Sequence, residues 1–141
     1  MNLNDIEIER AVIGEILIFE SLHTKALLLE PSDFAYDEHR IICKAIIKQL
    51  RKGNKYDFIT IANECGANYR NEIQNCIQLA ISAELFEEHF RLLKEMASRR
   101  RLIERFHTLT TDGDVSVSSV QKMLDDEKKA FTATETSSSP S

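Results

Sequence analysis

The amino-acid sequence predicts an all-α protein, a small orthogonal helical bundle followed by a C-terminal antiparallel helical hairpin. Three observations support this class. The 141 residues contain only four glycines and two prolines. Apolar residues recur at helical spacing along nearly the whole chain, and the stretch from Ser82 to Thr108 contains no helix breaker. A chain of this length buries roughly 68% of the surface that its unfolded form exposes, which is enough for a hydrophobic core.

The sequence divides into three segments. We expect residues 1–81 to form a globular helical bundle and residues 82–132 to form a helical hairpin of the same domain. Residues 133–141 have no apolar periodicity, so we expect a flexible linker or tail there.

The first helix is predicted to begin after Asn4, where Glu7 stands three residues on and completes a capping box. Gly14 falls in the middle of this helix and costs about 1 kcal/mol relative to alanine. A glycine at such a position suggests that another backbone passes close by.

The remaining helices of the bundle are marked by their end signals. Their expected bounds are Ser21–Leu29, Asp37–Arg51, Phe58–Cys65 and Tyr69–Ala80. Asp57 supplies an N-cap for the third of these, and Gly53 and Gly66 supply C-terminal caps for the second and third.

The long helix after Ser82 has two apolar faces. Its first apolar stripe consists of Phe86, Phe90, Leu93 and Ala97, and a later set consists of Leu102, Ile103 and Phe106. The two sets lie on largely different sides of the helix, so the helix needs two partners. A turn over Thr110–Ser116 and a last helix from Ser116 to about Thr132 predict a hairpin that covers only one of these faces.

Four polar residues within seven positions raise the question of a catalytic or metal site: Asp33, Asp37, Glu38 and His39. The two carboxylates next to the histidine fall in the first turn of a helix, where negative charge complements the macrodipole. His39 points along the buried stripe of that helix, and the positions three and four residues on hold Ile42 and Cys43 instead of a second histidine or carboxylate. We therefore interpret the cluster as a structural elbow between two helices.

The sequence contains no motif for catalysis. The phosphate-binding pattern GxxxxGK[ST] is absent, and the three cysteines form no CxxC pair. The other histidines, His23, His89 and His107, are too far apart in the sequence for a local metal motif. We predict no catalytic, cofactor-binding or metal-ligating residue, and we do not expect this chain to be an enzyme.

The net charge of -5 gives the chain no general attraction for nucleic acid. Arg99, Arg100 and Arg101 form the one basic cluster, and on a helix they spread over about 200°. We interpret them first as a solvated or salt-bridged surface, then as a polar interface, and last as a nucleic-acid contact. The N-terminus lacks a signal peptide and no apolar run is long enough to span a bilayer, so we expect a cytoplasmic protein without membrane contact.

Five short motifs occur in order along residues 4–131. They are ERAVIG from Glu9, the series Pro31, Asp33, Phe34, His39 and Arg40, the series Gly53, Asp57 and Thr60, then RRRLIE, and finally VSSVQKMLDDEKKAF. In this order they resemble the N-terminal domain of bacterial replicative hexameric helicases of the DnaB family.

The resemblance implies a non-catalytic collar domain that pairs with a second copy through its hairpin, builds toward a hexameric ring and docks primase or a helicase loader. It implies that the parent protein is an ATP-dependent DNA helicase whose ATP and Mg²⁺ bind in a separate motor domain, and that this chain meets DNA only indirectly. The second apolar face of the long helix would then be covered by the other subunit. The candidate interface residues are Leu102, Ile103, Phe106, Leu109, Val117 and Val120.

Three alternatives stay open. The helicase-binding domain of primase is thought to share this fold, although the Glu9–Gly14 and Asp33–Arg40 motifs favour the helicase. A stand-alone helicase-binding adaptor or mimic, of phage or plasmid type, needs no motor domain. A helical nucleic-acid binder would use Arg99–Arg101.

Overall fold

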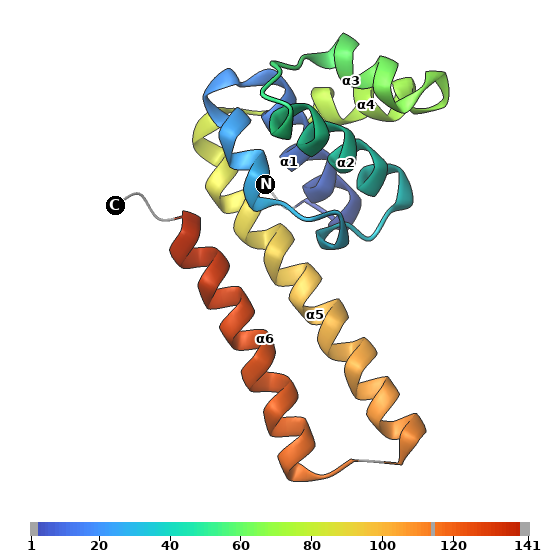
Figure 1. Cartoon of the computed structure of the whole chain (residues 1–141), viewed down its shortest axis with the longest axis vertical. Helices are drawn as coiled ribbons and strands as arrows, with labels where there is room; N and C mark the ends of the chain where they lie inside the picture. Colours follow the sequence, from blue (N-terminus) through green and yellow to red (C-terminus); the bar gives the residue numbers. More distant parts are fainter. Residues whose placement is uncertain (1–2, 114, 139–141) are drawn as a thin grey trace. The chain divides into compact units, whose positions relative to one another are not determined.

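The computed structural model of the chain describes residues 3–113 and 115–138, with the backbone alone described over 132–138. All regular secondary structure in these residues is helical, so the predicted all-α class is confirmed. The α-helices are α1 (Asp5–Ile18), α2 (Asp37–Arg51), α3 (Phe58–Cys65), α4 (Arg70–Gln78), α5 (Phe86–Asp112) and α6 (Val117–Ser138) (Figure 1). Short 3-10 helices connect them: η1 (Glu20–Leu28), η2 (Pro31–Asp33), η3 (Ala67–Tyr69) and η4 (Ala83–Leu85).

The chain forms two compact units, which we call the bundle unit (Met1–Leu93) and the hairpin unit (Lys94–Ser141). The first turns of α5 belong to the bundle unit and the rest of α5 belongs to the hairpin unit. The sequence boundary expected between residues 81 and 82 therefore precedes α5, whereas the division between the compact units lies within it.

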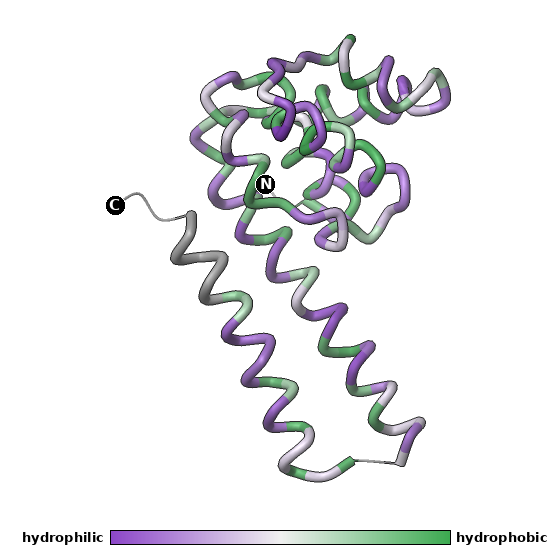
Figure 2. The backbone as a smooth tube through the Cα atoms, in the orientation of Figure 1, coloured by the Kyte–Doolittle hydropathy of each residue, from purple (hydrophilic) through white to green (hydrophobic). Residues whose placement is uncertain are grey.

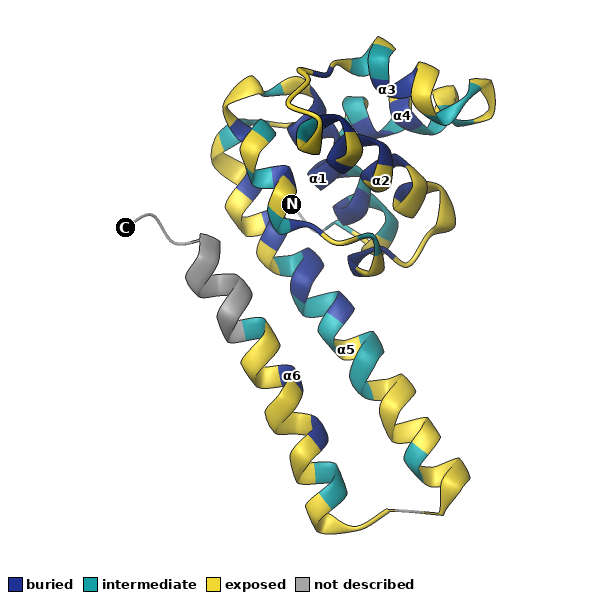
Figure 3. Ribbon diagram, viewed as in Figure 1, coloured by how far each residue is buried: buried dark blue, intermediate teal, exposed yellow. Residues whose placement is uncertain are grey.

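The bundle unit is built around α1. Nearly every residue from Ile8 to Leu17 is buried, as expected for a helix that other elements surround. It packs most extensively against α4, and also against η1 and α2. A Cβ atom on Gly14 would overlap the backbone carbonyl of Cys76, so the prediction that another backbone passes close to this glycine is confirmed. Figure 3 shows this burial along α1 and α2.

The predicted end signals of the helices are confirmed at several positions. The Asn4 side chain accepts a hydrogen bond from the Glu7 backbone N–H at 2.9 Å, and the Glu7 carboxylate accepts one from the Asn4 N–H at 3.0 Å. The Asp57 carboxylate accepts the backbone N–H of Thr60 at 2.8 Å. Gly66 ends α3 with a φ of 104°, a value that glycine adopts without strain.

Two helices differ from their predicted form. The segment expected as an α-helix over Ser21–Leu29 is the 3-10 helix η1. This segment has only nine residues, which is too short for a stable α-helix by helix propensity alone. Pro31 also disfavours helical backbone at the residue before it, so the helix cannot extend toward its C-terminus. The helix expected over Tyr69–Ala80 starts with the 3-10 turn η3 and continues as the shorter α4.

The hairpin unit consists of two antiparallel helices, the part of α5 after Leu93 and α6 (Figure 1). Polar contacts join them: Arg101 and Ser98 both donate to the Glu127 carboxylate, at 2.8 and 3.1 Å. Helix α6 continues to Ser138, past its predicted end near Thr132, because no glycine or proline interrupts the sequence before Pro140. Part of the predicted tail is thus helical, and residues 139–141 lie outside the described residues.

No described helix combines the length and the apolar character that crossing a lipid bilayer requires.

Candidate functional site

The elbow that precedes α2 contains a buried polar cluster centred on His39. Its Nδ1 lies 2.7 Å from Oε1 of Glu9 on α1, and its Nε2 lies 2.6 Å from Oε2 of Glu72 on α4. His39 is 1% exposed and Glu9 is fully buried, which confirms the predicted inward position of the histidine. The two glutamates that bind it were not predicted, because they lie about thirty residues away along the chain on either side.

The two carboxylates favour the charged form of His39. An ionised carboxylate only accepts hydrogen bonds, so a ring nitrogen that faces an ionised carboxylate carries a proton, and a carboxylate at each nitrogen favours the imidazolium. Burial by itself lowers the pKa of His39, but the hydrogen bonds and charges of Glu9 and Glu72 outweigh burial and raise this pKa above its usual value. The cluster is therefore an internal ion network that joins three helices.

Arg10 completes the network on the solvent side. Its Nε and Nη2 atoms donate to the two oxygens of Glu72 at 2.7 and 3.0 Å, a bidentate pair. Burial alone raises the pKa of Glu72, but hydrogen bonds from Arg10 and His39 dominate and lower it to about 2. Glu72 is therefore ionised at every pH near neutrality.

The network also holds the elbow itself. One oxygen of Glu9 accepts the backbone N–H of Ala35 at 2.8 Å, so the linker between η2 and α2 is tied to the central helix. The geometry favours the predicted structural role, because each polar group of the cluster satisfies another.

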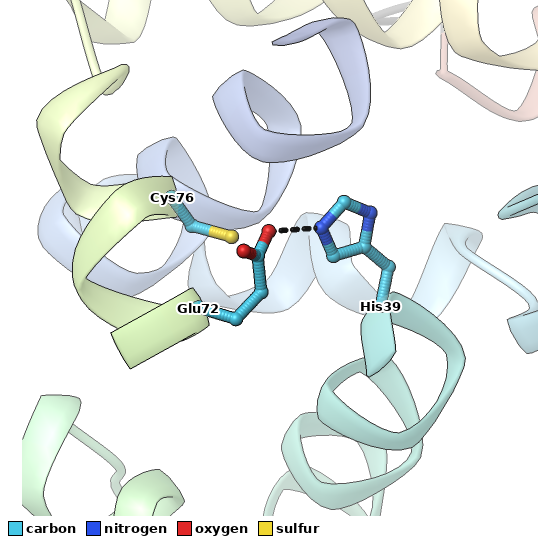
Figure 4. A group of neighbouring side chains, drawn as sticks. All are labelled: His39, Glu72 and Cys76. Carbon is cyan, nitrogen blue, oxygen red and sulfur yellow. Dashed lines mark hydrogen bonds and ion pairs between the residues drawn. The ribbon is translucent and has the colours of Figure 1, made fainter. Parts of the chain in front are cut away.

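His39, Glu72 and Cys76 also lie close enough together to be considered as a metal site, with their ligand atoms within 4.8 Å of one another (Figure 4). Two features oppose this use. The Glu72 oxygens already accept hydrogen bonds from Arg10, His39 and Asn75. Burial, and then the charge of Glu72, raises the pKa of the Cys76 thiol far above its usual value, whereas a metal binds the thiolate. The group is better explained as part of the ion network.

A second buried pair connects α1 to the first turns of α5. His89 Nδ1 lies 2.8 Å from Oε2 of Glu15, whose side chain is fully buried. Burial raises the pKa of Glu15, although the hydrogen bond from His89 opposes this rise. The sequence signal for both buried pairs is the presence of two glutamates, Glu9 and Glu15, inside the otherwise apolar run of α1.

The hairpin unit has one apolar side. A shallow hollow of about 570 Å³ opens between α5 and α6, and its lining is almost entirely apolar. Four of the six predicted interface residues line it: Leu102, Ile103, Phe106 and Val120. Ile103 is 69% exposed and Phe106 is 45% exposed. The bands of apolar residues along both helices are visible in Figure 2.

The other two predicted interface residues lie elsewhere. Leu109 lines a second hollow of about 340 Å³, together with polar residues that include Glu104, Arg105 and Thr108. Val117 is 88% exposed at the start of α6 and lines neither hollow. Leu124, which belongs to the apolar stripe of the last helix but was not among the predicted interface residues, also lines the first hollow and is 44% exposed.

The predicted basic cluster lies in the hairpin unit, where its charges are paired. Arg99 forms an ion pair with Glu95 at 2.9 Å, one turn away on α5. Arg101 forms an ion pair with Glu127 of α6 at 2.8 Å. Arg100 is half-buried. This arrangement favours a salt-bridged helix surface, while use of these arginines as a partner or nucleic-acid contact stays a prediction.

Comparisons with known proteins agree with the resemblance in the sequence. A family pattern described as "DnaB-like helicase N terminal domain" matches residues 1–98. The chain is 28% identical over 138 residues to the replicative DNA helicase DnaC of Bacillus subtilis (strain 168), covering 90% of this chain and 30% of the relative. It is 25% identical over 132 residues to the replicative DNA helicase DnaB of Geobacillus stearothermophilus, covering 86% of this chain and 28% of that relative. The chain thus spans less than a third of the length of either relative.

A solved structure shows the same fold. The crystal structure of the N-terminal domain of DnaB helicase from Mycobacterium tuberculosis matches with a TM-score of 0.74 at 22% identity, covering 87% of this chain and 97% of that one. This likeness concerns the fold alone, whereas the family pattern covers well over half of the sequence. The chain therefore belongs to the family of DnaB-like helicase N-terminal domains.

Proposed function

We propose that this chain is the collar domain of a replicative DNA helicase, and that it acts in ring assembly and partner docking without chemistry of its own. The observation that carries the proposal is the apolar side of the hairpin unit, where Ile103, Phe106 and Leu124 are exposed together beside a shallow hollow. Contiguous exposed apolar surface of this kind marks an interaction site.

The occupant proposed for this surface is the hairpin of a second copy of the chain. A two-fold pair buries the same patch on both partners, so a single apolar side is sufficient to make the interface. The opposite hollow contains charged and hydroxyl side chains, which suit a solvent-facing surface better. Dimers formed in this way would be the units from which a ring is built.

We assign the helicase activity stated in the names of the two relatives to the parts of those proteins that this chain does not cover. Strand separation, ATP and Mg²⁺ would belong to such a motor part. Primase or a helicase loader would dock on the assembled collar, and DNA would be met only indirectly.

The direct test is Phe106→Asp. A carboxylate in the apolar hollow would have to be desolvated on pairing, so the variant is expected to shift the oligomer toward monomer in sedimentation velocity. Thr108→Asp places the same charge in the polar hollow and serves as the matched control, with no expected shift. Circular dichroism checks that both variants keep their helicity. Unchanged association of the Phe106 variant would remove the apolar side from the interface.

A stand-alone adaptor that captures a helicase is an alternative to the collar. The size of the native polypeptide in its source cells separates the two, measured by immunoblot with an antibody against this chain. A band several-fold larger than 16.2 kDa is expected for the collar of a helicase. A band at 16.2 kDa would instead indicate the adaptor.

A further inference from the structure

A basic groove lies on the bundle unit, away from the polar cluster and independent of the hairpin. It has a volume of about 410 Å³ and opens between the C-terminal half of α2 and the linker from η1 to η2. Four cations line it: Lys44, Lys48 and Arg51 of α2, and Lys52, the C-cap residue that follows this helix. Leu29, Pro31 and Ile47 add apolar surface to the lining, and Glu30 is its one acidic residue, so the cations outnumber the carboxylate by four to one. We call these eight residues the basic groove.

The four cations share one face of α2. At 100° per residue they fall within an arc of about 100°, and at 1.5 Å per residue they extend over about 12 Å. All four are exposed. A chain with a net charge of -5 therefore presents a local stripe of positive charge, the opposite of its average character.

Internal contacts account for only part of this stripe. Lys48 forms an ion pair with Glu64 at 2.6 Å, whereas Lys44 and Arg51 form no salt bridge with any described residue. Arg51 is at the C-terminal end of α2, where a cation complements the helix dipole. Lys44 lies about two turns earlier, beyond the range of that effect, so helix stabilisation does not explain its position.

The floor of the groove limits which ligand fits. Leu29 and Ile47 are 5% and 8% exposed, so they offer a small apolar surface that suits one side chain. The lining contains no aromatic residue, and single-stranded nucleic acids are normally held by stacking on aromatic rings as well as by cations. A peptide that combines carboxylates with one apolar residue could pair with the cations of the groove and also contact its apolar floor.

We propose that the basic groove binds an acidic segment of a partner protein, helical, with carboxylates one turn apart and one large apolar side chain between them. The carboxylates would pair with Lys44, Lys48 and Arg51, which are themselves spaced by about one turn. The apolar side chain would contact Leu29 and Ile47. The negative charge of the chain as a whole would oppose acidic ligands elsewhere on its surface, which restricts this docking to the groove.

The test uses the 141-residue chain and a fluorescein-labelled peptide of about three helical turns, with glutamate at every fourth position and a single central leucine. Fluorescence anisotropy is expected to show saturable binding that weakens as salt is added. The double variant Lys44→Glu/Arg51→Glu is expected to weaken binding by roughly tenfold or more. The control Lys128→Glu/Lys129→Glu makes the same change in net charge at exposed positions of α6 and is expected to have no comparable effect.

Four results would overturn the proposal. The peptide could fail to bind, or both double variants could lose the same affinity for it. Replacing the leucine of the peptide by serine could leave the affinity unchanged. Labelled single-stranded DNA could bind more tightly than the peptide, with the Lys44/Arg51 variant abolishing that binding. The last result would identify the groove as a phosphate-binding surface. Circular dichroism of both variants ensures that a loss of affinity is not a loss of fold.

Discussion

The bundle unit and the hairpin unit use the same kinds of residue in opposite ways. In the bundle unit the large apolar side chains of α1 are buried, and its charged residues Glu9 and Glu15 are paired inside the core. In the hairpin unit Ile103 and Phe106 face solvent, and the ion pairs lie at a partly exposed surface. The bundle therefore satisfies its own contacts, whereas the hairpin leaves apolar surface for a second chain.

The largest expected difference concerns glycine replaced by alanine in the two units. Gly14→Ala would force a Cβ into the Cys76 carbonyl and separate α1 from α4, at a cost of about 3 kcal/mol or more. Gly113→Ala, in the hairpin turn, meets no neighbouring atom and is opposed only by its φ of 75°, at a cost of about 1 kcal/mol. Urea unfolding followed by circular dichroism compares the two. Equal costs would show that the α1–α4 contact is not tight.

These two glycines also show what local sequence can predict. The capping residues Asn4 and Asp57 act on groups within three residues of themselves, so their roles follow from the sequence directly. Gly14 was informative because glycine is costly in a helix, which implies a compensating contact. The partner of that contact, the carbonyl of Cys76, was not predictable, because nothing local to either residue specifies it.

The polar cluster marks the limit of such reasoning. The spacing around His39 predicted no histidine or carboxylate one turn away on the same helix, and the two groups that bind His39 are on α1 and α4. Long-range pairs leave no periodic signal in a single sequence. The same holds for the apolar side of the hairpin, where Leu102, Ile103, Phe106 and Val120 meet in one hollow while Leu109 and Val117 do not.

The second expected difference is in pH dependence. The pKa of His39 is raised in the folded protein, so its stabilising contribution is complete below the unfolded value of about 6.5 and is lost as pH rises through the folded pKa. The pKa of Glu72 is lowered to about 2, so its contribution is present above about 4.5 and is lost as pH falls toward 2. The bundle should therefore lose stability toward alkaline pH and, separately, in strong acid.

Replacing the histidine tests the alkaline limb. His39→Gln is expected to remove the fall in unfolding free energy that begins above about pH 6.5, and to cost about 3 kcal/mol at lower pH because it leaves the buried Glu9 carboxylate without its cationic partner. His107→Gln changes an exposed histidine of the hairpin unit and should preserve the slope. Urea titrations at a series of pH values measure both. A slope that persists in the His39 variant would assign the alkaline loss to another group.

The smallest expected effect compares one glutamate from each unit. Glu127→Gln weakens the pair with Arg101, whose side chain is 35% exposed and gains water as a replacement partner, so the cost is about 1 kcal/mol or less. Glu9→Gln removes the carboxylate that faces His39 Nδ1. Because the His39 ring is only 1% exposed, water cannot take the place of that carboxylate, so the cost should be several times larger. Hydrogen exchange of the α6 amides measures the first loss locally, and exchange of the α1 amides measures the second. Comparable losses at the two sites would mean that burial of the partner does not determine what an ion pair contributes in this fold.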